Sequence, residues 1–238
     1  MSAEEQTTIA ARVRSNLATV RGRINDAAIE AGRDPAAVTL MAVSKTITPL
    51  VIALAHDAGV TTFGENRVQE LQAKVAALPE LRWELIGTLQ RNKVRAALEV
   101  ATRIQSVDSI ALAEAIERIA AETDRIIPVL LQVNVVGEAT KHGVTPTEAI
   151  TVARAIARLP HLRGEGLMTV APAVDDQQLT RPVFAAMRVL RDRLRDEVGA
   201  TWTELSMGMS DDFPMAIAEG ATIVRIGRAL FGPRTNVL

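Results

Sequence analysis

Short apolar runs alternate with longer amphipathic segments along most of this chain. Eight runs are apolar at consecutive positions, which is typical of parallel strands covered on both faces. They span Val38–Val43, Val60–Phe63, Trp83–Ile86, Ile104–Val107, Ile127–Val135, Gly166–Val170, Trp202–Leu205 and Thr222–Ile226. The segments between these runs have the spacing of helices. The pattern therefore predicts eight strand-helix units.

Local signals support several of the helices. Apolar residues recur at helical spacing near the N-terminus, so residues 1–35 are predicted to hold a covering helix that ends near Gly32. Thr48 and Pro49 predict a helix start, with threonine as the cap and proline at the first helical position. Thr145–Glu148 has the pattern of a capping box, and one apolar stripe runs along Leu179–Val198.

Eight such units predict an α/β fold, a (β/α)8 TIM barrel, as one domain over residues 1–238. The rival architecture is a doubly wound open sheet. No predicted strand is followed by a G-x-G-x-x-G turn, and the last run would make a poor edge strand, so the pattern favours the barrel.

Composition narrows the function classes. A net charge of -1 without a basic block predicts no binding to nucleic acid. The absence of Cys excludes disulfides, thiolate metal sites and a cysteine nucleophile. The polar, acidic N-terminal residues do not resemble a signal peptide, and no apolar run is long enough for a membrane span. We therefore expect a cytoplasmic protein without a membrane partner.

The first predicted strand is followed closely by a lysine. In a barrel of this kind, chemistry lies at the C-terminal ends of the strands, so Lys45 would lie over the barrel mouth. Desolvation there would lower the pKa of the amine and make it a better former of Schiff bases. The alternative is a solvated lysine on the barrel rim.

Two later loops have the features of an anion site. Ser210–Asp212 is predicted to start a helix after the seventh strand, and Gly227 with Arg228 follows the eighth. Helix N-termini favour anions, glycine lets the backbone approach closely, and barrels often hold phosphate after these two strands. The alternative is that Ser210 only caps a helix and Gly227 only forms a turn.

An arginine interrupts the last apolar run. Arg225 could face the ring nitrogen of a bound cofactor, or it could form an ion pair with a carboxylate such as Glu65. The sequence leaves both roles open.

Six ordered motifs carry a resemblance to a known family. They are Ala42–Thr46, Phe63–Glu70, Ile86–Lys93, Gly166–Thr169, Leu205–Asp212 and Val224–Gly227. Together, from about Val38 to Arg234, they resemble the YggS/PROSC family of pyridoxal phosphate homeostasis proteins. That family has the barrel fold of the alanine racemase N-terminal domain without the second, β domain.

The resemblance implies roles for individual residues. Lys45 would carry pyridoxal 5'-phosphate as an aldimine, and Arg225 would face the pyridine nitrogen. Ser210 and the backbone amides of Gly227 and Arg228 would hold the phosphate. Two further residues, Asn66 and Ser206, match other pocket-lining positions.

The chain departs from the family pattern at two positions. Thr88 stands where many members have histidine, and Arg228 where many have a small hydroxyl residue. A backbone amide survives any change of side chain, so the phosphate site is still expected. Lys141 matches a family lysine that could accept the aldehyde secondarily, although a solvated loop lysine is the alternative.

Three function classes compete. A homeostasis protein would bind, buffer and deliver the cofactor, with apo-enzymes as recipients and no turnover of its own. A racemase or decarboxylase of this fold needs a second acid or base, normally tyrosine or cysteine, and the chain contains neither residue. Of the histidines, only His142 is expected in a rim loop. A cofactor-free Schiff-base aldolase would leave Arg225 without a role. The sequence therefore favours the homeostasis protein, with the racemase as the alternative.

Overall fold

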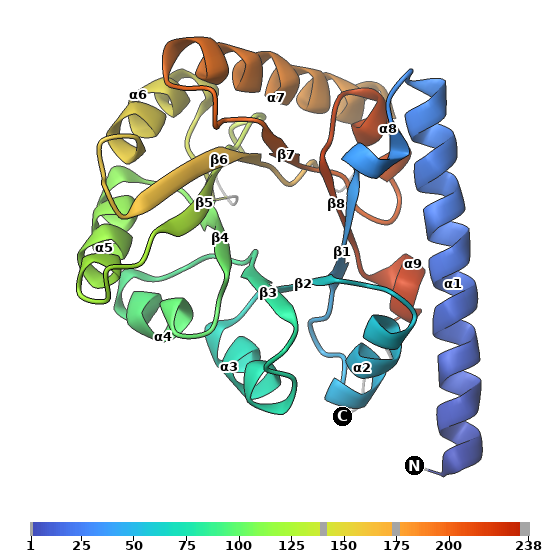
Figure 1. Ribbon diagram of the computed structural model, residues 1–238. Helices are drawn as coiled ribbons and strands as arrows, with labels where there is room; N and C mark the ends of the chain where they lie inside the picture. The colour runs from blue at the N-terminus through green and yellow to red at the C-terminus, as the bar shows by residue number, and fades with distance from the viewer. Residues whose placement is uncertain (1, 139–141, 173–176, 234–238) are drawn as a thin grey trace.

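The fold is a closed barrel of eight parallel strands surrounded by helices (Figure 1). The computed structural model describes residues 2–138, 142–172 and 177–233, with the side chains of residues 177–179 left out. Its strands are β1 (Thr39–Val43), β2 (Thr62–Glu65), β3 (Arg82–Leu85), β4 (Arg103–Val107), β5 (Ile127–Gln132), β6 (Leu162–Met168), β7 (Glu204–Ser206) and β8 (Ile223–Ile226). All eight predicted strands are confirmed, and the open sheet is excluded.

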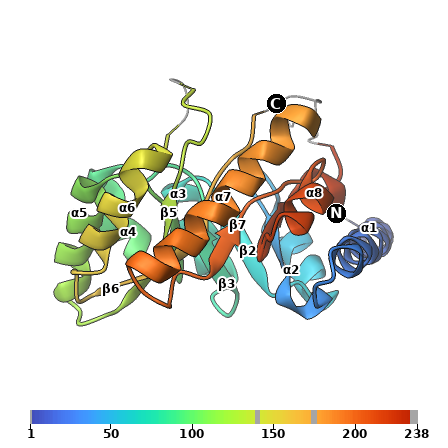
Figure 2. The same ribbon diagram turned by 90° about the horizontal axis from the view of Figure 1, so that it is seen from above.

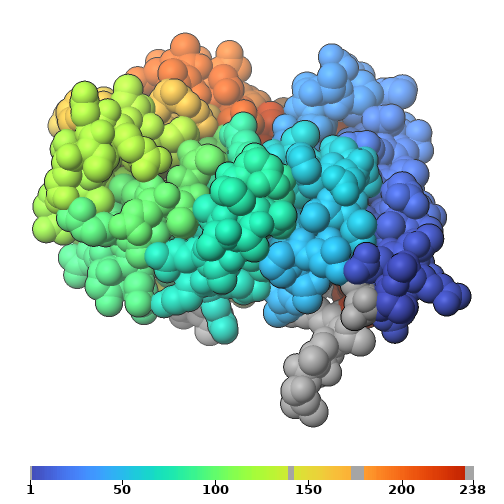
Figure 3. All heavy atoms as spheres, turned by 60° about the horizontal axis from the view of Figure 1, so that its bottom comes forward, coloured from blue at the N-terminus to red at the C-terminus, as the bar shows by residue number. Residues whose placement is uncertain are grey.

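Helices follow the strands around the outside of the barrel (Figures 1 and 2). The α-helices are α1 (Ala3–Glu30), α2 (Pro49–Asp57), α3 (Val68–Ala77), α4 (Val94–Leu98), α5 (Ile110–Ala121), α6 (Pro146–Ile156), α7 (Gln177–Glu197), α8 (Phe213–Ala218) and α9 (Arg228–Phe231), with 3-10 turns η1 (Pro35–Ala37) and η2 (Arg91–Lys93). In Figure 3, α1 lies along the right edge of the molecule. The segments from α2 onward follow one another in chain order across the visible face toward the left. No helix in the described part of the chain has the length and apolar character to cross a membrane.

Pairing between the first and last strands closes the barrel. Thr39 pairs with Ile223, and Met41 pairs with Arg225. Since all the strands are parallel, their C-terminal ends meet at one rim. The turn after β1 and the loops after β7 and β8 are therefore neighbours, as the sequence predicted.

The predicted helix signals are realised to different degrees. Thr145 and Glu148 form the expected capping box at the start of α6. Thr48 is the N-cap of α2, but its side chain makes no capping hydrogen bond, so that part of the prediction is wrong. Gly32 follows the end of α1 in the left-handed region, at φ 67°, where glycine is favoured.

The N-terminal helix packs against the last part of the chain. Asn16 Nδ2 donates to the carbonyl of Leu230 at 2.9 Å, and Arg33, just after the helix, donates to the carbonyl of Ile217 at 2.7 Å. The guanidinium of Arg23 lies 4.5 Å from the centre of the Phe213 ring. Helix α1 thus supports α8 and α9, the two short helices beside the rim.

The main apolar core lies between the strands and the surrounding helices, with Trp83, Trp202, Phe63 and Phe184 among its largest buried side chains. A smaller apolar cluster of Met41, Leu130, Met168 and Ile223 is separate from it. Polar side chains on the strands are also buried. Arg103 of β4 makes ion pairs with Glu84 and Glu165, each at 3.0 Å or less.

Candidate cofactor-binding site

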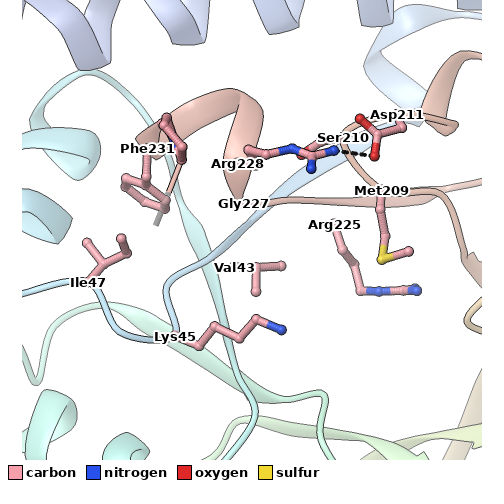
Figure 4. A pocket seen from close by; sticks show the side chains of 12 residues that line it. Val43, Lys45, Ile47, Met209, Ser210, Asp211, Arg225, Gly227, Arg228 and Phe231 are labelled. Atoms are coloured by element: carbon pink, nitrogen blue, oxygen red, sulfur yellow. Dashed lines mark hydrogen bonds and ion pairs between the residues drawn. The ribbon is translucent and has the colours of Figure 1, made fainter. Parts of the chain in front are cut away.

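A cavity of about 490 Å³ lies at the rim, beside the ends of β1, β7 and β8. Its walls are made by Val43, Lys45, Ile47, Met209, Ser210, Asp211, Arg225, Gly227, Arg228, Phe231, Gly232 and Pro233 (Figure 4). The structure therefore brings five of the seven predicted site residues to one cavity. The remaining two, Asn66 and Ser206, lie outside its wall.

Lys45 occupies a tight turn directly after β1. The amide of Ile47 donates to the carbonyl of Ser44 at 2.9 Å, which leaves Lys45 and Thr46 at the two central positions of the turn. The Lys45 side chain is half-buried. Figure 4 shows it extended, with its ammonium end directed to the side on which Arg225 lies. This placement agrees with a lysine at the barrel mouth.

The loops after β7 and β8 meet through Ser210. Its hydroxyl accepts a hydrogen bond from the amide of Ala229 at 3.2 Å, so it joins the first turn of α9. The helix predicted after Ser210–Asp212 is confirmed, but it begins at Phe213 with Asp212 as its N-cap, so a helix start at Ser210 is wrong. A tight turn precedes it, in which Asp212 Oδ1 accepts from the amide of Met209 at 2.5 Å.

Gly227 is the N-cap of α9, so the first amides of this helix have no partner within the helix. Among the described residues, a Cβ placed on Gly227 would meet only Val43, at 3.5 and 3.6 Å, which are ordinary contact distances. The protein's own packing therefore does not require glycine here. The Arg228 side chain makes an ion pair with Asp211, and both side chains are exposed (Figure 4).

Arg225 is buried and lines the cavity. It donates to Ser206 Oγ at 2.8 Å and to the carbonyl of Thr169 at 2.7 Å. Burial lowers its pKa to about 10, although the charge of Asp212 acts in the opposite direction. The alternative role, an ion pair with Glu65, is absent from the described structure, where Glu65 binds Lys74 and Ser44 instead.

The other predicted residues lie near the cavity without lining it. Ser206 contacts the site through Arg225 and also donates to Gln105 Oε1 at 2.6 Å. Asn66 follows β2 and is half-buried, and Thr88 follows β3 and is exposed. Lys141 lies outside the described residues.

Sequence reasoning missed the polar residues behind the site. Gln105 links Ser206 to Glu84, since its Nε2 donates to Glu84 Oε2 at 2.7 Å. Lys74 lies beneath the Lys45 turn and is only 5% exposed. The available signals were charged and amide residues within predicted strands, and the helical spacing of Glu70 and Lys74.

Comparison with known proteins places the chain in a family. It matches the model of the alanine racemase N-terminal domain over residues 11–235. It is 42% identical over 220 residues to the pyridoxal phosphate homeostasis protein of Aquifex aeolicus, covering 92% of this chain and 96% of the relative. It is 43% identical over 228 residues to the protein of the same name from Pseudomonas aeruginosa, covering 93% and 96%.

A solved structure shares both the fold and much of the sequence. It is PipY of Synechococcus elongatus with PLP bound, which is 39% identical, has a TM-score of 0.80, and is matched over 92% of this chain and 100% of that one. The chain is thus an alanine racemase N-terminal-domain barrel. Within that class it belongs to the family of pyridoxal phosphate homeostasis proteins, and the resemblance inferred from the sequence motifs is confirmed.

Proposed function

We propose that this protein binds pyridoxal 5'-phosphate at the rim cavity and acts in its homeostasis by holding, buffering and delivering it. One observation carries the proposal: an amine, a buried guanidinium and a helix N-terminus line the same cavity. These groups match the aldehyde, the ring nitrogen and the phosphate of the cofactor. The PLP bound to PipY and the names of the relatives support it.

In this proposal Lys45 forms an aldimine with the cofactor. The neutral amine adds to the aldehyde carbon and water leaves, so that a C=N bond replaces the C=O bond without oxidation or reduction. Water reverses the step and restores the free amine. A reversible bond at an open rim suits a protein that must release what it binds.

The phosphate would lie between Ser210 and the first amides of α9, at Gly227 and Arg228. Charge-assisted hydrogen bonds there contribute roughly 1.5 to 3 kcal/mol each. We therefore expect the protein to bind pyridoxal phosphate far more tightly than pyridoxal. Equal affinity for the two compounds, measured by titration of the visible absorbance, would refute this part of the proposal.

We further propose that the protein has no strong turnover of its own. The bound cofactor supplies an electron sink in enzymes, but a charged arginine at the ring nitrogen discourages its protonation. The chain has no Tyr or Cys to act as the second base. His161 directly precedes β6, at the opposite end of the barrel, and its ring binds Glu117. The ring of His56 lies within hydrogen-bond distance of the Val60 carbonyl. His142 lies 3.8 Å from Asp108.

Borohydride trapping tests the covalent bond. Reduction of the loaded protein should fix the cofactor on Lys45, as seen by peptide mass mapping, and Lys45→Ala should lose the visible chromophore while remaining folded. Label on another lysine, with Lys45 unmodified, would defeat the assignment.

Exchange of the α-proton separates the homeostasis protein from the racemase. The loaded protein is incubated with L-alanine, L-lysine or L-serine in heavy water, and the α-proton is followed by NMR. Exchange no faster than with free cofactor is expected. Repeated fast exchange that Lys45→Ala abolishes would favour a racemase instead.

Delivery is tested by mixing the loaded protein with an apo-enzyme that requires the cofactor. The enzyme should gain activity, and a failure to do so would leave a protein that stores the cofactor without delivering it. The recipient enzymes and residence in the cytoplasm stay predictions.

A further inference from the structure

A buried lysine lies directly beneath the turn that carries Lys45. Lys74 belongs to α3, and its ammonium donates to the carbonyl of Ser44 at 2.6 Å. It also pairs with Glu65 at the end of β2, and with Glu70 at 2.9 Å. Lys74 does not line the cavity, so it acts on a ligand there only through other residues.

The partners of Lys74 hold the turn on both sides of Lys45. The carbonyl of Ser44, on one side, receives the hydrogen bond from Lys74 itself. The amide of Thr46, on the other side, donates to Glu70 Oε1 at 2.6 Å, and Glu70 is held in turn by Lys74. Ser44 Oγ also donates to Glu65 at 2.7 Å. One ammonium thus fixes the peptide groups before and after Lys45.

The turn needs such support because of its backbone conformation. Thr46 has a φ of 67°, in the left-handed region that a β-branched residue rarely adopts. A residue in that region keeps its conformation only where its surroundings impose it. The bond from the Ile47 amide to the Ser44 carbonyl closes the turn, and the hydrogen bond from the Thr46 amide ties it to Glu70 of α3.

Electrostatics make Lys74 the centre of this arrangement. Glu65 is fully buried, and its burial raises the pKa of the carboxyl group while the hydrogen bond from Lys74 lowers it. Without Lys74, the negative charges of Glu65 and Glu70 would repel each other with no cation between them. The carbonyl of Ser44 would lose its bond to Lys74, and the two carboxylates that bind Ser44 Oγ and the Thr46 amide would no longer be held in place by the ammonium.

We propose that Lys74 is a positioning residue, which holds the strained turn so that the Lys45 amine points into the cavity at the position of the cofactor aldehyde. This inference rests on the proposed covalent binding at Lys45. It predicts that loss of Lys74 slows the reaction of Lys45 without removing the phosphate site, which lies on the loops after β7 and β8.

The experiment compares a covalent and a noncovalent ligand. Pyridoxal phosphate reacts with Lys45, whereas pyridoxine 5'-phosphate has an alcohol in place of the aldehyde and reports the phosphate site alone. In Lys74→Met we expect the rate of borohydride-trapped labelling at Lys45 to fall about tenfold or more, since small misplacements of reacting groups have effects of this size. Affinity for pyridoxine 5'-phosphate should stay within about twofold.

Rescue distinguishes positioning from general damage. Glycine adopts a positive φ without strain, so Thr46→Gly in the Lys74→Met background should restore most of the labelling rate. Glu219→Met is the matched control, because Glu219 is a buried carboxylate that pairs with Arg181 and Arg188 and does not line the cavity. This variant should change neither the labelling rate at Lys45 nor the affinity for pyridoxine 5'-phosphate.

Glu70→Ala serves as a second variant if Lys74→Met does not fold. Its side chain is 28% exposed, and its removal takes the acceptor from the Thr46 amide, so labelling should slow in the same direction. Normal labelling in the folded variants, or loss of pyridoxine 5'-phosphate binding in parallel with labelling, would overturn the inference. Wild-type protein that is not labelled at Lys45 would instead refute the proposed function on which it rests.

Discussion

Replacement of Arg225 by methionine should leave the fold at least as stable as before. Burial lowers the pKa of Arg225 from 12.5 to about 10. At roughly 1.4 kcal/mol per pKa unit, a charged guanidinium at this position costs about 3 to 4 kcal/mol. Because the folded pKa is below the unfolded one, this cost is fully present below about pH 10 and is relieved only above it.

The contacts of Arg225 offset part of that cost. Ser206 keeps its hydrogen bond to Gln105 when the arginine is removed, but the carbonyl of Thr169 loses a donor, which costs about 1 to 3 kcal/mol. We therefore expect the effect of Arg225→Met on the free energy of unfolding to lie between no change and about 3 kcal/mol of stabilisation.

Urea unfolding at neutral pH measures this change, with Arg103→Met as the matched control. Arg103 is also 5% exposed, but two carboxylates surround it, and its pKa is raised because Glu84 and Glu165 outweigh its burial. Breaking such a buried ion pair should cost about 3 to 5 kcal/mol. Titration with pyridoxal phosphate should rank the two variants in the opposite order, because Arg225→Met should lose more affinity than Arg103→Met. We expect Arg225→Met to bind the cofactor about tenfold or more weakly than wild type.

A loss of stability in Arg225→Met equal to that of Arg103→Met would refute this reasoning. Arg225 would then be a residue that stabilises the barrel despite the cost of its burial. Unchanged affinity for the cofactor would contradict the functional role separately.

Three further predictions concern the rim and the dependence of stability on pH in the acid range. Gly227→Ala should have a free energy of unfolding within about 1 kcal/mol of wild type, because its Cβ would make ordinary contacts. Gly227→Val should weaken the binding of pyridoxal phosphate, as measured by titration. Arg228→Ser breaks only an exposed ion pair with Asp211, so stability should change by less than about 1 kcal/mol, and a large loss of affinity would reveal a side-chain contact to phosphate. A hydrogen bond from Arg181 holds the pKa of Glu219 below 4.5, so the contribution of Glu219 to stability is complete above that pH and lost below its folded pKa. Glu219→Gln should therefore lose less free energy of unfolding on acidification, and an unchanged pH dependence in urea titrations would contradict this.

The barrel could be predicted from the sequence because the apolar runs are short, regularly spaced and separated by clear helix signals. Parallel strands then fix which loops meet, so the convergence of Lys45, Ser210 and Gly227 follows from topology alone. The helix start at Ser210 could not be predicted correctly. Serine and aspartate are good caps, but here the serine oxygen binds an amide of another helix.

The residues behind the site could not be predicted for a different reason. Lys74 and Gln105 are polar residues whose burial depends on partners from other strands and helices. Local pattern reasoning assigns a lysine on a helix to the solvent. Only the three-dimensional arrangement shows that Glu65 and Ser44 surround it.

The pairing of β1 with β8 determines when, during folding, the site can form. Lys45 and Arg225 belong to segments that are far apart in the chain and adjacent only after the barrel closes. Contacts of such long sequence separation form slowly, because the intervening chain must be ordered first. A ligand that bonds to both Lys45 and Arg225 would join the first strand to the last. It would bind only molecules whose barrel is closed, and it would therefore stabilise the closed barrel.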